Sequence, residues 1–171
     1  DFIRNNLLKR YVPKEQIIYV SKLFRKYKLR FIMQNMLCLP TEDLDKALET
    51  LKLNIECKPT YAWASIFQPY PKTELAEYSI KNELMEGQIG NYYYYDSPLK
   101  VKDKREMENL QRFFDVTVHH PYLLPLVKQL IKLPKNRIFD IIFQVNGAIK
   151  GIKIGLVEPS LDLLKVYKRA T

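Results

Sequence analysis

Two stretches decide the fold of this chain: Arg30-Phe-Ile-Met-Gln-Asn-Met-Leu-Cys-Leu-Pro-Thr-Glu-Asp-Leu44 and Tyr61-Ala-Trp-Ala-Ser-Ile-Phe-Gln-Pro-Tyr-Pro-Lys-Thr73. Each opens as an apolar run of strand length and ends in a turn that contains proline. A helical crossover between them returns the chain in the same direction, so we expect strands 29–37 and 61–67 to pair in parallel. Their turns, 38–41 and 68–72, then lie on one edge, where α/β folds bind ligands.

Helices are predicted before, between and after these strands. Pro13 begins an amphipathic helix over 13–27, and Thr41 is the expected N-cap of a helix near 43–55. Thr73 is the expected N-cap of a third helix, which ends near Asn82. The residues predicted to face inward are Leu44, Ala47, Leu48 and Leu51 in the second helix, and Leu75, Tyr78 and Ser79 in the third.

Beyond a turn-rich stretch from Gly87 to Pro98, the apolar pattern is purely helical. The predicted organisation is therefore an α/β segment over 1–86, a linker over 87–102 and an α-helical extension over 103–171. Prolines punctuate the joints of this extension, and we expect no strand in it. Its predicted buried stripes are Met107, Leu110, Phe113, Phe114 and Thr117; Leu123, Leu126, Val127, Leu130 and Ile131; and Ile138, Ile141, Ile142, Val145 and Ile149.

Two strands and one helix cannot close a sheet, and strands that are apolar on both faces require neighbouring strands. We therefore expect the βαβ unit to be a segment of a larger parallel sheet or barrel. The opening at Asp1 enters in the middle of a pattern, so we expect a longer protein.

The two turns resemble the fifth and sixth strand ends of a radical SAM barrel, of the type that carries a cobalamin-binding domain. The usual forms there are Asn-Met-Ile-Gly-Leu-Pro-Gly-Glu-Thr and Ser-Ile-Phe-Gln-Pro-Tyr-Pro-Gly-Thr. The resemblance covers 1–82 closely, including Asn6-Leu-Leu-Lys-Arg10, and 95–133 more loosely. It implies an α/β fold in which the last two parallel strands of a partial (β/α) barrel precede a helical C-terminal extension.

The resemblance also implies a function: the C-terminal fragment of a cobalamin-dependent, methyltransferase-like radical SAM enzyme. S-adenosylmethionine, a [4Fe-4S] cluster and cobalamin are the cofactors of the full-length family. The CxxxCxxC cluster loop is absent here, so the implied partner is a preceding part of the same protein. The implied site residues are Asn35, Met36, Leu37, Cys38, Leu39 and Pro40 on the adenine side, and Gln68, Pro69 and Tyr70 on the substrate side.

This sequence departs from the family pattern at three turn glycines, which are Cys38, Thr41 and Lys72 here. Glycine at such positions permits a positive φ or a close ligand approach. We therefore expect three turns in which a positive φ or a close ligand approach is now penalised.

Four other features allow more than one interpretation. Cys38 is a nucleophile or a small buried filler, and His119-His120 is a metal-binding pair or a surface pair between helices. Glu42 contacts a ribose or an adenosine amine, or compensates a helix dipole. Tyr92 to Tyr95 stack on bases or cover the floor of the barrel.

The net charge of +9 invites a nucleic-acid interpretation, but the basic residues are dispersed, which is typical of solvated faces and makes nucleic acid an unlikely partner. Two cysteines and no apolar run of membrane-spanning length favour a reducing, cytoplasmic setting. No hydrolase, zinc-protease or nucleotide-binding motif is present. The alternative function is a basic helical binding module for RNA or for a membrane surface, because 121–152 is apolar on one side and Lys-bearing on the other.

Overall fold

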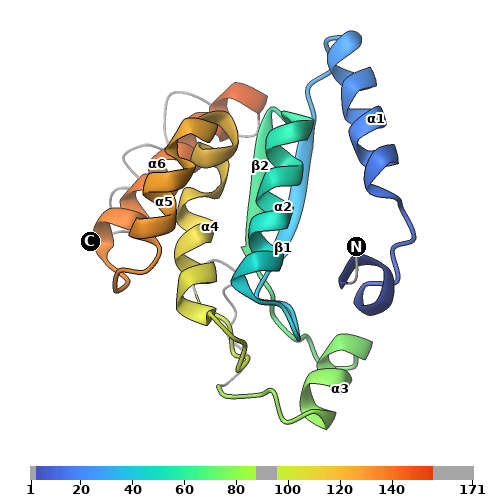
Figure 1. The fold of residues 1–171 in the computed structure, drawn as a ribbon, viewed down its shortest axis with the longest axis vertical. Helices are drawn as coiled ribbons and strands as arrows, with labels where there is room; N and C mark the ends of the chain where they lie inside the picture. Colours follow the sequence, from blue (N-terminus) through green and yellow to red (C-terminus); the bar gives the residue numbers. More distant parts are fainter. Residues whose placement is uncertain (1–2, 88–95, 156–171) are drawn as a thin grey trace.

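The computed structural model describes residues 3–87 and 96–155, in which helices surround a two-stranded sheet (Figure 1). The helix α2 covers one face of the sheet. The helices α4, α5 and α6 lie on the β2 side, and α1 lies on the β1 side (Figure 1). The elements are a π-helical turn η1 (Ile3–Leu7), α1 (Lys14–Lys26), β1 (Ile32–Leu37), α2 (Leu44–Cys57), β2 (Tyr61–Ile66), α3 (Glu74–Lys81), α4 (Lys104–His119), a 3-10 turn η2 (Pro121–Leu123), α5 (Leu124–Leu130) and α6 (Arg137–Ile154).

The predicted parallel pairing is confirmed. The strands β1 and β2 pair in parallel from Ile32 opposite Tyr61 to Leu37 opposite Ile66, and α2 connects them. Their carboxyl ends meet at one edge, so the two predicted turns lie together there (Figure 1). The protein is therefore an α/β fold with an open parallel sheet, of which two strands lie in the described residues.

The predicted N-cap residue is correct for α3 and wrong for α2. Thr73 caps α3, accepting a hydrogen bond at its hydroxyl from Ala76 N at 3.3 Å. For α2 the prediction of Thr41 is wrong, because the N-cap is Asp43, whose carboxylate accepts from Lys46 N at 3.0 Å. Thr41 has φ 65°, whereas an N-cap residue needs extended backbone.

The main core lies between one face of the sheet, α2 and α4. The predicted inner stripe of α2 is confirmed, with Leu44 at its margin, and every predicted residue of the α4 stripe is buried. The two strands contribute small and branched side chains on alternate residues, as expected for one face of a pleated sheet. The sheet residues of this core are Leu37, Ala62, Ala64 and Ile66.

The helix α4 closes the outer edge of β2 with two polar side chains. The Asp115 carboxylate accepts a hydrogen bond from Ala62 N at 2.7 Å, and Gln111 Nε2 donates to the Ala64 carbonyl at 3.1 Å. Both side chains are buried, and neither of them was predicted to be. Two backbone groups that another strand would normally pair are therefore satisfied by a helix.

Among the residues that the structure describes, none covers the outer edge of β1 in this way. The Leu37 carbonyl accepts from Phe67 N at 2.9 Å, which turns this residue toward β2. By alternation, the backbone groups of Ile32, Gln34 and Met36 point to the other side. Within the described residues no further strand pairs with that side.

The helical extension is confirmed as helices without a strand in the described part of 103–154. The predicted stripe of α6 is wrong at four of its five residues, because Ile138, Ile141, Val145 and Ile149 are exposed, whereas Ile142 is partly buried against the core. The buried side instead includes Phe139, whose ring centroid lies 4.8 Å from that of Phe113. Since α6 carries apolar residues on both sides, periodicity alone cannot identify the buried one.

Two smaller corrections concern α3 and α5. Tyr78 of α3 is exposed instead of facing inward, while Ser79 is buried as predicted. In the α5 stripe, Val127 and Ile131 are buried and Leu126 is exposed. Among the described residues, no helix combines the length and the apolar character needed to cross a membrane.

Candidate functional site

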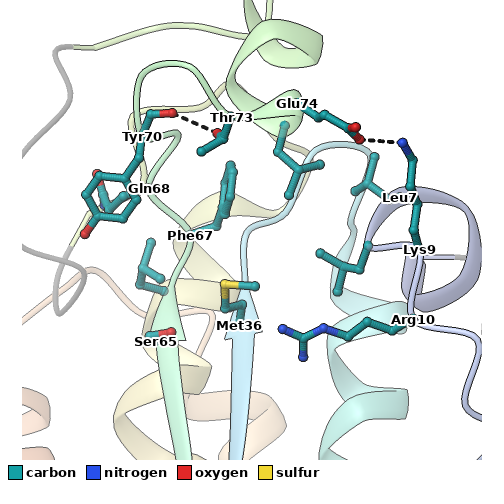
Figure 2. A pocket seen from close by; sticks show the side chains of 13 residues that line it. Leu7, Lys9, Arg10, Met36, Ser65, Phe67, Gln68, Tyr70, Thr73 and Glu74 are labelled. Atoms are coloured by element: carbon teal, nitrogen blue, oxygen red, sulfur yellow. Dashed lines mark hydrogen bonds and ion pairs between the residues drawn. The ribbon is translucent and has the colours of Figure 1, made fainter.

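A pocket of about 500 Å³ lies at the carboxyl ends of β1 and β2 (Figure 2). Parallel strands expose their terminal backbone and side chains at this edge, which is why such edges form binding sites. Three segments form its wall: the strand ends, the N-terminal residues 7–10, and the start of α3. The lining residues are Leu7, Leu8, Lys9, Arg10, Met36, Ser65, Ile66, Phe67, Gln68, Tyr70, Thr73, Glu74 and Leu75.

The wall of the pocket is apolar in its centre and charged at its rim. Met36 and Phe67 project between the strand ends, and Leu7 faces them from the N-terminal segment (Figure 2). At the rim, Lys9 Nζ and Glu74 Oε2 form an ion pair at 2.5 Å, which joins the N-terminal segment to α3. The hydrogen bond to Glu74 raises the pKa of Lys9.

Two polar side chains of the lining differ in their access to a ligand. Arg10 is exposed, and Figure 2 shows its guanidinium beside Met36. Gln68 is buried and donates from Nε2 to the Asp96 carbonyl at 2.8 Å, whereas its Oε1 has no hydrogen-bond partner in the described residues. Around its apolar centre the lining thus offers the Arg10 guanidinium, while the second cation of the lining, Lys9, is paired with Glu74.

The predicted site residues divide into two groups. Met36, Gln68 and Tyr70 line the pocket, so the structure brings together side chains from both predicted turns. Pro69 lines a neighbouring pocket of about 160 Å³ below α3.

The other five predicted residues do not line the pocket. Asn35 points toward α2, where it and Asn54 exchange amide hydrogen bonds of 3.1 and 2.9 Å. The remaining four are buried in the protein interior: Leu37, Cys38, Leu39 and Pro40.

The three turn positions at which the resembling pattern has glycine all have positive φ, which is one of the two reasons expected for glycine there. Cys38 has φ 61°, Thr41 has φ 65° and Lys72 has φ 67°. This conformation brings the side chain of an L-residue close to its own backbone, at about 1 kcal/mol or more for each residue. Five further described residues other than glycine have positive φ, including Lys9 at the rim of the pocket. The edge of the sheet therefore carries strained turns on both strand ends.

Glu42 holds the first of these turns. Its side chain is 3% exposed, and its Oε2 accepts a hydrogen bond from Leu39 N at 3.0 Å. Burial raises the pKa of Glu42 to about 7, although hydrogen bonds from the backbone of Leu39 and Cys38 act in the opposite direction. Asp43, and not Glu42, is the N-cap of α2. Glu42 instead stabilises the turn after β1 through its hydrogen bond with Leu39 N.

Cys38 fills space in the protein interior, which is one of the two interpretations given for this residue. Its side chain is inaccessible, and burial raises the pKa of the thiol well above its usual value, which disfavours the nucleophilic thiolate. Ser65 lines the pocket, but its hydroxyl donates to the Asn35 carbonyl at 3.2 Å. The arrangement is suited to binding a ligand, and no nucleophile with an adjacent base is formed by these two side chains.

The histidine pair lies away from the pocket, at the end of α4. His119 Nδ1 lies 3.3 Å from the Asp115 carboxylate, and His120 contacts the ring of Tyr122. No group of three metal-ligating side chains occurs among the residues that the structure describes. The other open feature, Tyr92 to Tyr95, lies outside the described residues, as does part of the predicted linker.

Sequence reasoning missed the N-terminal wall and the cation of the pocket. Arg10 ends the segment Asn6-Leu-Leu-Lys-Arg10, which resembles the family pattern but carries no motif that assigns a role. Ser65 was missed although it lies within the predicted strand. The alternation that turns Met36 and Ser65 toward the same side would have identified it.

Comparison of the chain with protein-family models, with curated proteins and with solved structures finds no match.

Proposed function

We propose that this chain is the C-terminal part of a cobalamin-dependent radical SAM enzyme of the methyltransferase type. In this proposal β1 and β2 supply the fifth and sixth strand ends of the barrel, and the pocket forms part of its mouth. The observation that carries the proposal is the positive φ at Cys38, Thr41 and Lys72. The resembling pattern has glycine at all three positions, and these residue types do not favour that conformation by themselves.

The two edges of the sheet give a second line of support. The sixth strand of such a barrel has no successor, and α4 occupies the outer edge of β2 through Asp115 and Gln111. The fifth strand needs a neighbour on its other side, and the outer edge of β1 lacks one in the described residues. A preceding strand of the same protein would pair there with the backbone of Gln34 and its neighbours.

The pocket fits one of the implied cofactors in size and character. A volume of about 500 Å³ lies within the range of small-molecule sites, and its apolar centre suits a planar base. Met36 would contact the base, and the Arg10 guanidinium would donate to polar groups of the ligands. Gln68 would hold its part of the lining in place through the hydrogen bond that it donates to the Asp96 carbonyl. These assignments concern S-adenosylmethionine and the substrate together, since both approach this edge in the family.

The residues of this chain do not fit a [4Fe-4S] cluster. Such a cluster requires three or four thiolates, and the two cysteines, Cys38 and Cys57, are both buried in packed surroundings. In the proposal the cluster ligands and the cobalamin-binding domain therefore belong to the preceding part of the protein. We assign no chemical step of the reaction to this chain.

The coding sequence that precedes Asp1 gives the first test, because the proposal requires a CxxxCxxC loop there. The second test is anaerobic reconstitution of the longer protein with iron and sulfide, followed by assay of 5′-deoxyadenosine formation from S-adenosylmethionine. We expect cluster absorbance and cleavage from the longer protein and neither from residues 1–171 alone. A longer protein without the cysteine loop, or without cleavage after reconstitution, would refute the proposal.

Variants within this chain make the test specific to the pocket. Met36→Ala and Gln68→Ala should weaken S-adenosylmethionine or substrate binding by roughly tenfold each, because each removes a contact from the lining. Ile138→Ser is the matched control, since Ile138 is 66% exposed on α6 and lines neither pocket. Equal effects of all three variants would argue against a binding role for the pocket.

A further inference from the structure

The helix α6 has two apolar sides, and only one of them is used within the described structure. The inner side holds Phe139 and Gly151, both buried, so the helix is fixed to the protein along that side. The outer side carries branched aliphatic residues at helical spacing. We define the α6 outer face by the residues with these exposed fractions: Ile138 66%, Ile141 50%, Val145 45% and Ile149 55%.

The charged residues of α6 that flank its outer face have one sign. With about 100° per residue, Arg137 and Lys153 fall on opposite flanks of the aliphatic row, and both are exposed. The one acidic residue of α6, Asp140, projects from the inner side, where its carboxylate accepts from Arg112 Nε at 3.1 Å. The outer face is thus an aliphatic row with cationic flanks and without a carboxylate.

We propose that the α6 outer face binds peripherally to a membrane surface that contains anionic lipids. The helix lies in the plane of the membrane, its aliphatic row enters the boundary between headgroups and acyl chains, and Arg137 and Lys153 contact lipid phosphates. The net charge of +9 attracts the whole chain to such a surface. This inference goes beyond the proposed function and does not depend on it.

The charges favour a membrane over a second copy of the chain. Two α6 outer faces packed against each other would bring Arg137 and Lys153 of one copy close to the same cations of the other. A bilayer surface with anionic headgroups instead offers opposite charge over the whole length of the helix. Burial of isolated aliphatic side chains in lipid also needs no complementary groove, and the exposed row of α6 is a ridge of one helix.

Sedimentation with vesicles tests the proposal. The chain should bind vesicles of equal phosphatidylcholine and phosphatidylglycerol and should not bind phosphatidylcholine alone, and binding should weaken as salt is raised. The double variant Ile141→Ser/Ile149→Ser should reduce partitioning by at least about tenfold, because it removes aliphatic groups from the membrane boundary. Arg137→Gln and Lys153→Gln should each reduce it about fivefold. Ile80→Ser, which removes a still more exposed isoleucine from α3, should leave partitioning unchanged.

A fluorescent label shows which surface meets the lipid. Both native cysteines are 0% exposed, so a maleimide dye attached to Ile141→Cys reports on the α6 outer face alone. We expect a blue shift with anionic vesicles for Ile141→Cys and none for Ile80→Cys. Absence of binding, binding that the double serine variant does not weaken, or a dimer that this variant dissociates would each overturn the proposal.

Discussion

The two outer edges of the sheet differ although their strands have the same length. At β2, a carboxylate and an amide of α4 replace the missing neighbour, and both side chains are buried. At β1, alternate backbone groups point away from β2, and Ile32 and Gln34 are exposed. The β2 edge is therefore covered by side chains of α4, whereas the β1 edge can still accept a strand.

A helix can therefore end a parallel sheet when its polar side chains are spaced to hydrogen-bond the free backbone groups of the last strand. Gln111 and Asp115 are four residues apart in α4, which places both on one side of the helix. Asp115 also accepts a hydrogen bond from Asn146 Nδ2 at 2.9 Å and lies 3.4 Å from Lys150 Nζ. One carboxylate thus joins β2, α4 and α6.

Loss of Asp115 should have the largest effect. Asp115→Ala leaves Ala62 N, Asn146 and Lys150 without their common acceptor in a buried setting, and we expect a loss of about 3–5 kcal/mol in the free energy of unfolding. Urea unfolding followed by circular dichroism measures it. Glu49→Ala, an exposed carboxylate of α2, is the control and should change stability by less than about 0.5 kcal/mol. A loss below about 1 kcal/mol for Asp115→Ala would show that the β2 edge does not need this cover.

A pair of proline substitutions in β1 compares its two sides directly. Met33→Pro removes a backbone donor that faces β2 and should lower the free energy of unfolding by about 3 kcal/mol or more. Gln34→Pro removes a donor that faces the open edge, where proline is tolerated, and should cost below about 1 kcal/mol. Thermal unfolding of both variants provides the comparison. Equal losses would mean that the outer side of β1 is already paired.

The two buried carboxylates near these strands should respond to pH in opposite ways. Hydrogen bonds from His119, Ala62 and Asn146 lower the pKa of Asp115 despite its burial, so its contribution is lost as the pH falls through that pKa. For Glu42, burial raises the pKa from 4.5 to about 7, so the folded state binds the proton more tightly than the unfolded state does. Stability should then decrease as the pH rises from 4.5 to 7, by about 3 kcal/mol in total.

Glu42→Gln should remove this decrease, because the amide does not ionise. Urea unfolding at pH 5 and pH 8 should show that the advantage of the variant over the natural protein grows with pH. Glu49→Gln serves as the control with no such trend, because Glu49 is exposed. A constant difference between Glu42→Gln and the natural protein would contradict the burial of an ionisable Glu42.

Restoring glycine at the strained turns should have the smallest effect. Thr41→Gly and Lys72→Gly should each raise the free energy of unfolding by about 1 kcal/mol, since φ values of 65° and 67° are free of strain only for glycine. Lys52→Gly, at an exposed position inside α2, should lower it by about 1 kcal/mol. If all three variants are destabilised alike, the turns after β1 and β2 are not strained.

The sequence by itself determined the elements and their pairing. Apolar runs of strand length, a helical pattern between them and proline at both turns were sufficient for the parallel pair, for α2 and for the common edge of the two turns. Three of the residues with positive φ, Cys38, Thr41 and Lys72, lie in the two turns that end these strands. These are short-range properties, and residues close in sequence carry them.

Tertiary structure alone decided which surfaces are covered. The buried polar side chains of α4 close the β2 edge, Leu7 and Arg10 complete the pocket from a distant segment, and α6 packs with the side opposite to the predicted one. Periodicity reports that a helix has an apolar side, but it does not report what lies against that side. Where both sides are apolar, as in α6, the neighbouring elements choose between them, because burial depends on contacts between residues far apart in the chain.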